Sequence, residues 1–366
     1  MKSFLFFTFV SFSSYAHYSK PQLVARYSGI DAFNAPNGLS CFRSEPQPTL
    51  DGVFLGCVTD QGYVMMKWNP APEVLALSQF GMFSHPKEVL GKTNWYEFSE
   101  AGVNNLFEYQ NQSLTKIELK NLGPIDSLID SFSAIKNKSY VYRLQNEEKT
   151  LQLWNNNQVS TLYTENISHI FPPVSSVDGN FLIKIRRNDL NEGSPDALLL
   201  WNDGFRKILE DRDTDSSSAF KAFRHQYAID GETVAVIVTD DKSEALLLIN
   251  GDKKVEVARA GIDLVSFDYF SPKLRNGVLV FRGLDLKNRK SIWVYQNGNL
   301  SKLLTQGDVV QTDKGPARTD YQNQDAIFYG APGIGPHGEI YLQSTLTDIN
   351  FPMTRLGIGL IRFNKE

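Results

Sequence analysis

Aromatic side chains stand beside polar ones in several loops of this 366-residue chain, and these loops are the first places where binding chemistry could occur. Aromatic faces with hydrogen-bonding groups beside them suit sugar rings or peptide side chains. Binding residues gather on loops that a rigid scaffold presents. We therefore expect a ligand surface formed by His85, His169, Tyr269, Tyr321 and Tyr329. The phenylalanines in the same loops fit interior packing better.

Carboxylates alternate along residues 210–216, whose sequence is EDRDTDS. Such a loop can bind Ca²⁺ through Asp211, Asp213 and Asp215 if it curls around the ion. It lacks the glycine and the distal glutamate of a helix–loop–helix calcium site, so a solvated acidic loop is the interpretation we favour. Apart from this Ca²⁺ candidate, we expect no cofactor.

The chain contains no motif that predicts catalysis. It lacks the Gly-x-Ser-x-Gly elbow, the phosphate loop and the dinucleotide fingerprint, and its histidines lack zinc-site spacing. The glycine-rich stretch 330–335 contains a proline and precedes a strand, so we expect a connection there. Histidines from distant units could still converge at one point of the fold. The five are His17, His85, His169, His225 and His337.

An aspartate recurs just after the second strand of five predicted units. Aspartate in a turn hydrogen-bonds its own backbone, and a residue present in most units is poorly matched to a single active site. We therefore interpret these aspartates as turn residues. They are Asp60, Asp189, Asp240, Asp285 and Asp348.

The N-terminus has the features of a secretory signal over residues 1–16, although a buried first strand is the competing interpretation. Lys2 is followed by a short apolar stretch, and small residues flank Tyr15 before His17. No later segment reaches the roughly 18 uninterrupted apolar residues of a membrane span. We expect an exported protein, periplasmic or extracellular, with one domain over residues 17–366.

Export bears on the two cysteines, Cys41 and Cys57. Disulfides form and persist in oxidising compartments, so we expect one between them rather than two free thiols. On the chain-entropy estimate, closing so short a loop stabilises the fold by about 3 kcal/mol.

A repeat organises the rest of the chain. A hydrophobic strand ends at a large residue, passes through a turn and continues into a second strand, in seven copies. Most of these turns are rich in Asn and Gly, which tolerate the positive φ angles that tight hairpins need. The copies are 41 to 48 residues apart, with a longer insertion before the last. Their marker residues are Trp68, Tyr109, Trp154, Trp201, Ile249, Tyr295 and Phe363.

Each copy is preceded by another strand, and further upstream by a phenylalanine that suits a short innermost strand. Four strands per unit at this spacing predict an all-β fold, a seven-bladed β-propeller of four-stranded antiparallel blades. An open solenoid is the competing architecture. The strands precede the markers at 52–57, 95–98, 140–144, 181–185, 233–238, 277–281 and 339–342, and the phenylalanines are Phe42, Phe83, Phe132, Phe171, Phe223, Phe270 and Phe328.

The seventh unit stops at its turn, three residues after Phe363, and lacks an outer strand. The segment 22–29 resembles 255–261, which is the predicted outer strand of the fifth unit. We therefore expect the N-terminal strand to complete the last blade, which would hide two sheet edges. A solenoid has no use for this exchange.

Two kinds of motif also carry a family resemblance. Residues 272–281, followed by 291–295, resemble the tandem NxxGxxAF-type repeats of exported bacterial proteins. The Asp-Gly pairs at 178–179 and 230–231, each before a strand, resemble the propeller repeats of the TolB type. The resemblance implies a propeller fold and export, and it implies no catalytic residues.

Two functions remain open. With a formal charge of −4, the chain has no basic excess for nucleic acid. We expect a monomeric, non-enzymatic binding or scaffold protein whose long-loop face holds a glycan or protein ligand. The alternative is a hydrolase or lyase that acts on a carbohydrate or lactone at the central channel. Fold alone does not decide between them.

Overall fold

The computed structural model describes residues 18–29, 31–41, 44–99, 102–118, 132–136, 139–144, 147–155, 158–163, 167–187, 195–320 and 327–366. The expected signal segment 1–16 lies outside these ranges, as do Tyr321 and Asp189. Within them the chain forms strands β1 to β33 and no α-helix. The described part contains no helix long and apolar enough to cross a membrane.

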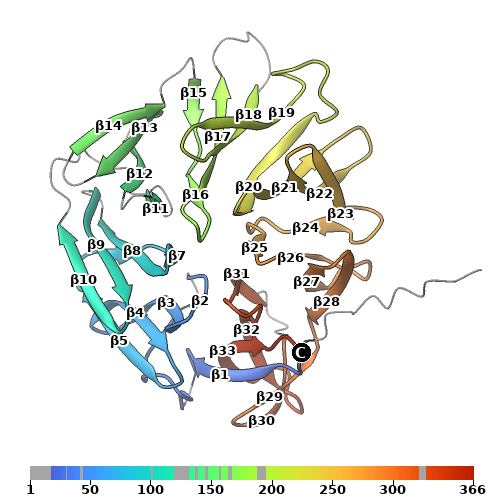
Figure 1. Cartoon of the computed structure of the whole chain (residues 1–366). Coiled ribbons are helices and arrows are strands. Elements are labelled where there is room, and N and C mark those ends of the chain that lie inside the picture. The colour runs from blue at the N-terminus through green and yellow to red at the C-terminus, as the bar shows by residue number, and fades with distance from the viewer. Residues whose placement is uncertain are drawn as a thin grey trace, which may run out of the picture.

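The described strands form seven sheets, numbered here in chain order and arranged around a common centre (Figure 1). Sheets 1 to 3 contain β2 (Gln47–Thr49), β3 (Gly52–Thr59), β4 (Gly62–Trp68) and β5 (Pro72–Ser78); β6 (Met82–Phe83), β7 (Lys87–Val89), β8 (Lys92–Ser99), β9 (Gly102–Gln110) and β10 (Ser113–Glu118); and β11 (Phe132–Ile135), β12 (Ser139–Leu144), β13 (Glu147–Asn155) and β14 (Gln158–Tyr163).

Sheets 4 to 6 follow the same order from the centre outward. They contain β15 (Ile167–Ile170), β16 (Val174–Ser175), β17 (Phe181–Arg187), β18 (Asp196–Trp201) and β19 (Phe205–Glu210); β20 (Ala222–Asp230), β21 (Thr233–Thr239), β22 (Glu244–Asn250) and β23 (Lys253–Arg259); and β24 (Ser266–Phe267), β25 (Lys273–Arg275), β26 (Val278–Leu284), β27 (Lys290–Gln296) and β28 (Asn299–Thr305).

Sheet 7 joins the two ends of the chain. Its strands β31 (Phe328–Ile334), β32 (Ile340–Asp348) and β33 (Arg355–Phe363) are followed by β1 (Gln22–Tyr27), which pairs antiparallel with β33. The register runs from Gln22 opposite Arg362 to Tyr27 opposite Ile358. The expected addition of the N-terminal strand to the last sheet is confirmed.

The long insertion before the last unit is a hairpin rather than an irregular loop. Its strands are β29 (Val309–Thr312) and β30 (Gly315–Arg318), and β29 lies parallel to β1 with Gln22 opposite Gln311. The sheet order becomes β30-β29-β1-β33-β32-β31. The hairpin therefore lies against the outer strand of sheet 7.

Apolar clusters hold each sheet to the next. Successive residues of a strand point to opposite faces, and both faces of these sheets are covered, so the strands are near-continuous apolar runs. In β26, Val278 and Val280 pack toward sheet 7, whereas Leu279 and Phe281 pack toward sheet 5. The described residues form seven such clusters, and one of them joins sheet 7 to sheet 1.

The predicted turn chemistry is present. Asn111, Asp203 and Asn297 adopt φ angles of 50°, 57° and 51° in hairpin turns, where their short polar side chains tolerate the left-handed region. Three of the recurring aspartates accept backbone N–H groups two to four residues ahead and are confirmed as turn residues. They are Asp240, Asp285 and Asp348.

Candidate ligand-binding site

The innermost strands, which surround the centre of the ring in Figure 1, are interrupted in most sheets. In sheets 2, 4 and 6 the inner strand is split into two short strands that pair with the same neighbour. In sheets 5 and 7 a register shift bulges the inner strand. Bulges re-aim side chains and are frequent beside functional sites. The interruptions span residues 84–86, 171–173, 268–272, 224–226 and 330–332.

A pocket of about 600 Å³ lies at the interruptions of sheets 2, 6 and 7, and the loop that leads into sheet 1 lines it as well. We call it the axial pocket. It brings together His85 from sheet 2, Tyr269 from sheet 6 and Tyr329 from sheet 7, which are three of the five residues expected to bind a ligand. Glu45 and Arg282, which sequence analysis did not single out, line it too.

Arg282 connects the two sides of the axial pocket. Its side chain is 4% exposed and lies 2.7 Å from the Asp268 carboxylate, while another of its N–H groups donates to the Gly330 carbonyl at 2.6 Å. The guanidinium stacks over the Phe270 ring, 4.0 Å from its centroid. Burial lowers the pKa of Arg282, and Asp268 partly offsets this. The interrupted inner strand of sheet 6 is thereby fixed against sheet 7.

Tyr269 is the exposed aromatic face of the axial pocket, with 82% of its surface accessible. The Arg224 guanidinium lies 5.6 Å from the centre of its ring. Arg224 is itself held by a two-pronged ion pair with Glu244 and donates to the Asp268 carbonyl at 2.9 Å. The loop that carries Tyr269 is therefore anchored from sheet 5.

Glu45 reaches the axial pocket on a loop of sheet 1. Its carboxylate lies 2.5 Å from the Lys273 ammonium and 4.0 Å from Nδ1 of His85, and it accepts the backbone N–H of Ala331 at 3.2 Å. The predicted disulfide between Cys41 and Cys57 is confirmed and ties the start of this loop to β3. The disulfide thus helps to position Glu45.

The glycine-rich stretch 330–335 was expected to be a connection, and this prediction was wrong for most of it, because residues 330–334 belong to the inner strand β31. The physical reason is close approach. A Cβ at Gly333 would lie 2.1 Å from the carbonyl oxygen of Pro46. A Cβ at Gly330 would lie 2.9 Å from the carbonyl oxygen of Ser44. Glycine lets the Glu45 loop lie directly on this strand.

His169 lies in a different place, between sheets 4 and 5. Its ring meets Phe171 edge-on at 4.4 Å, and Phe171 stacks on His225 at 5.7 Å. Burial, together with the positive charges of Lys184 and Arg224, lowers the pKa of His225. His169 therefore does not join the residues of the axial pocket.

The three aspartates of the acidic loop lie in different environments. Asp211 is 2% exposed and accepts the backbone N–H groups of Asp196 and Thr214. Asp215 accepts the backbone N–H and the hydroxyl of Ser217, and Asp213 is exposed. Among the described residues there is no group of three or more acidic, His or Cys side chains placed to hold a metal ion. Calcium at this loop stays a prediction.

Solved structures are similar to this chain at low sequence identity. An acylaminoacyl peptidase in complex with Z-Gly-Gly-Phe-chloromethyl ketone is 12% identical, with a TM-score of 0.51 over 88% of this chain and 52% of that one. TolB from Acinetobacter baumannii is 11% identical, with a TM-score of 0.42 over 71% and 63%. The lectin of the fungus Aleuria aurantia, a six-bladed β-propeller, is 8% identical, with a TM-score of 0.40 over 72% and 94%.

The chain is a β-propeller. It spans about half the length of the acylaminoacyl peptidase chain that it matches. The sequence matches no protein-family model and no curated protein. Since these structural similarities fall at 12% identity or below, the residues of the axial pocket have to carry any argument about what this propeller does.

Proposed function

We propose that this chain is an exported, non-enzymatic binding protein whose axial pocket holds a glycan. The observation that supports this most is the Tyr269 ring, which is 82% exposed on the wall of a pocket that also presents Asp268 and Arg282. The C–H face of a sugar can stack on such a ring while the sugar hydroxyls meet the flanking charged groups.

We further propose that each of the seven sheets is one blade of a seven-bladed ring. The support is the set of seven apolar clusters, each shared by two neighbouring sheets, with sheet 7 packed on sheet 1. In such a ring the inner strands of sheets 1, 2, 6 and 7 approach the axis from adjacent sides. This arrangement accounts for a pocket with contributions from four blades.

Export is proposed on two grounds, the signal-like residues 1–16 and the Cys41–Cys57 disulfide, which suits an oxidising compartment. The expected mature chain begins at His17 and is a monomer. Mass spectrometry of the protein recovered from the periplasm or medium of an expressing bacterium, followed by light scattering, tests both statements. A cytoplasmic product that starts at Met1 contradicts export.

A glycan array probed with the purified protein tests the proposed ligand class. We expect a limited set of glycans to bind the wild-type protein. Their binding should be lost with Tyr269→Ala, a substitution at an exposed side chain that leaves folding intact. A control variant, Phe80→Ala, removes an aromatic ring that is 91% exposed and does not line the pocket, and it should bind as the wild type does. Equal binding by all three proteins, or no binding at all, contradicts the proposal.

The alternative is hydrolysis or lyase chemistry, and the presence of two carboxylates, Glu45 and Asp268, in one pocket favours it over other enzymatic functions. Both already have a cation partner, Lys273 and Arg282 respectively, which suits a structural or binding role better. Mass spectrometry of each bound glycan after incubation distinguishes the two. Turnover that is abolished by Glu45→Gln supports the enzyme, whereas unchanged glycans support binding.

A further inference from the structure

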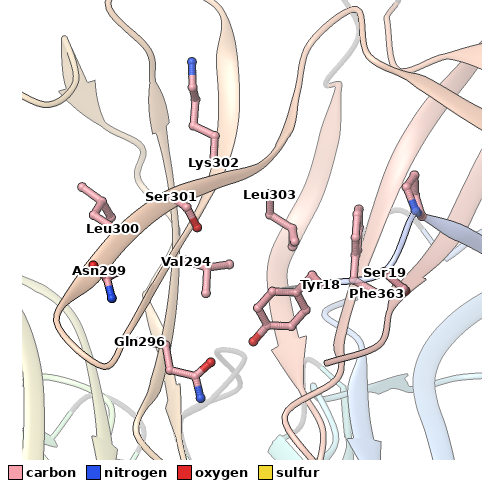
Figure 2. A pocket seen from close by; sticks show the side chains of 11 residues that line it. Tyr18, Ser19, Val294, Gln296, Asn299, Leu300, Ser301, Lys302, Leu303 and Phe363 are labelled. Carbon is pink, nitrogen blue, oxygen red and sulfur yellow. The ribbon is translucent and has the colours of Figure 1, made fainter. Parts of the chain in front are cut away.

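A second pocket, of about 410 Å³, lies at the outer rim between β28 of sheet 6 and the segment that leads into β1 (Figure 2). We call it the rim groove. Five consecutive residues of β28, Asn299 to Leu303, line it on one side. Tyr18, Ser19 and Phe363 line the other side. The groove therefore follows the length of a strand rather than surrounding a point.

The β28 strand is the outer edge of its sheet in the described part of the chain. An edge strand presents a row of N–H and C=O groups that an added strand can satisfy. In the neighbouring sheet the corresponding strand, β1, is paired with β29 at one position, where Gln22 lies opposite Gln311. The same molecule thus pairs a strand with one outer edge and leaves the adjacent edge open above a groove.

The walls of the rim groove combine apolar side chains with two polar groups. Val294 and Phe363 are each 2% exposed and, with Leu303, form the apolar part. Gln296 is 5% exposed, and neither its Oε1 nor the Tyr18 hydroxyl has a hydrogen-bond partner within the described residues. Burial and the nearby charge of Glu339 raise the pKa of Tyr18 to about 12, so the hydroxyl remains a donor.

The unsatisfied groups match a main chain. A peptide unit offers an N–H for an amide oxygen and a C=O for a hydroxyl. Lys302 is the one charged residue that lines the rim groove, and its ammonium lies 3.4 Å from the Asp285 carboxylate and over the Trp293 ring. Figure 2 shows the Lys302 side chain directed away from Tyr18. A neutral groove along an open strand edge suits a peptide backbone better than an ionic ligand.

We propose that the rim groove binds an extended peptide segment of a protein partner, which adds a strand along β28 and places an apolar side chain against Leu303 and Phe363. This site is separate from the axial pocket. Its success or failure is therefore independent of the proposed glycan ligand.

The test uses a phage-displayed library of random dodecapeptides, selected on the wild-type protein, and synthetic copies of the enriched peptides. Ser301→Trp fills the rim groove at an exposed position of β28. Its matched control is Ser160→Trp, which makes the same change at an exposed position of β14, the outer strand of sheet 3. We expect Ser301→Trp to weaken binding at least tenfold and Ser160→Trp to change it less than twofold.

Hydrogen exchange provides a second measurement that does not depend on the variants. Bound peptide should slow amide exchange over Asn299–Leu303 relative to the free protein. Enriched peptides that bind Ser301→Trp as tightly as the wild type overturn the proposal. The proposal is also overturned if a bound peptide slows amide exchange in the Tyr269 loop and loses its binding to Tyr269→Ala. The axial pocket would then be the peptide site.

Discussion

Arg26 and Asp313 form a two-pronged ion pair between the N-terminal strand and the turn of the inserted hairpin. The Arg26 Nε lies 2.9 Å from one Asp313 oxygen, and a terminal nitrogen lies 2.7 Å from the other. Arg26 is 1% exposed and also donates to the carbonyls of Asp31 and Leu356. The strand that closes the ring is thus fixed both by its ladder with β33 and by a buried charge.

Asp313→Asn should destabilise the closed fold. The substitution leaves a buried guanidinium without its counter-charge. We expect it to lower the free energy of unfolding by about 2–3 kcal/mol, which is less than for a fully buried pair because Asp313 itself is partly exposed. Urea denaturation measures this. The control is Lys314→Met in the same turn, which removes an exposed pair with Asp31 and should cost less than about 0.5 kcal/mol. Equal effects of the two variants would argue against a stabilising role for the Arg26–Asp313 ion pair.

The contribution of this pair should depend on pH in one direction. The hydrogen bonds from Arg26 outweigh burial and hold the pKa of Asp313 below its usual value of 3.8. A carboxyl group whose pKa is lower in the folded than in the unfolded protein stabilises the fold at pH values above its pKa in the unfolded chain. This stabilisation is lost as the pH falls through its pKa in the folded protein. The difference in unfolding free energy between wild type and Asp313→Asn should be constant from pH 7 to 5 and shrink below pH 3.8. A difference that does not shrink at all between pH 5 and pH 2 refutes this.

Much of the fold follows from local sequence. The strands and turns could be predicted because tight hairpins need residues such as Asn111 and Asn297 at positive φ, and because sheets covered on both faces leave apolar runs such as Leu279–Phe281. The pairing of the β29–β30 hairpin with β1 could not be predicted, since it joins segments almost 290 residues apart. The N-terminal strand was predictable only from its likeness to another outer strand.

The candidate site was less predictable. Aromatic and polar types in the loops pointed to His85, Tyr269 and Tyr329, but nothing local separates them from His169, which the ring places between other sheets. Arg282 was missed because an arginine within an apolar strand carries no spacing signal. Its one signal was the cost of burying a charge there, which requires a partner such as Asp268.

Gly333→Ala tests the seating of the Glu45 loop on β31. The added Cβ would meet the Pro46 carbonyl oxygen at 2.1 Å, so the loop or the strand must shift, and we expect a loss of roughly 1–3 kcal/mol in unfolding free energy. Gly204→Ala is the matched control, because its Cβ would meet nothing within 4 Å. Denaturation midpoints compare the two. A neutral Gly333→Ala would mean that this contact is not made in solution.

Reduction of the Cys41–Cys57 disulfide should weaken both stability and the axial pocket. The bridge spans a sequence separation of 16, for which the chain-entropy model predicts about 3 kcal/mol. The same loop carries Glu45, so glycan affinity should fall as well. Thermal unfolding and glycan binding with and without dithiothreitol measure the two effects, and the variant Cys41→Ala/Cys57→Ala should reproduce both without reductant. If the reduced protein binds the glycan with unchanged affinity, the disulfide does not help to position the axial pocket.

The most direct measurement is calorimetric titration of one array-selected glycan into the wild-type protein, Tyr269→Ala and His169→Ala. Because Tyr269 lines the axial pocket and His169 does not, the dissociation constant should rise more than tenfold for Tyr269→Ala and less than twofold for His169→Ala. The reverse pattern, with His169→Ala weakening the glycan and Tyr269→Ala leaving it unchanged, would contradict the axial pocket as the binding site.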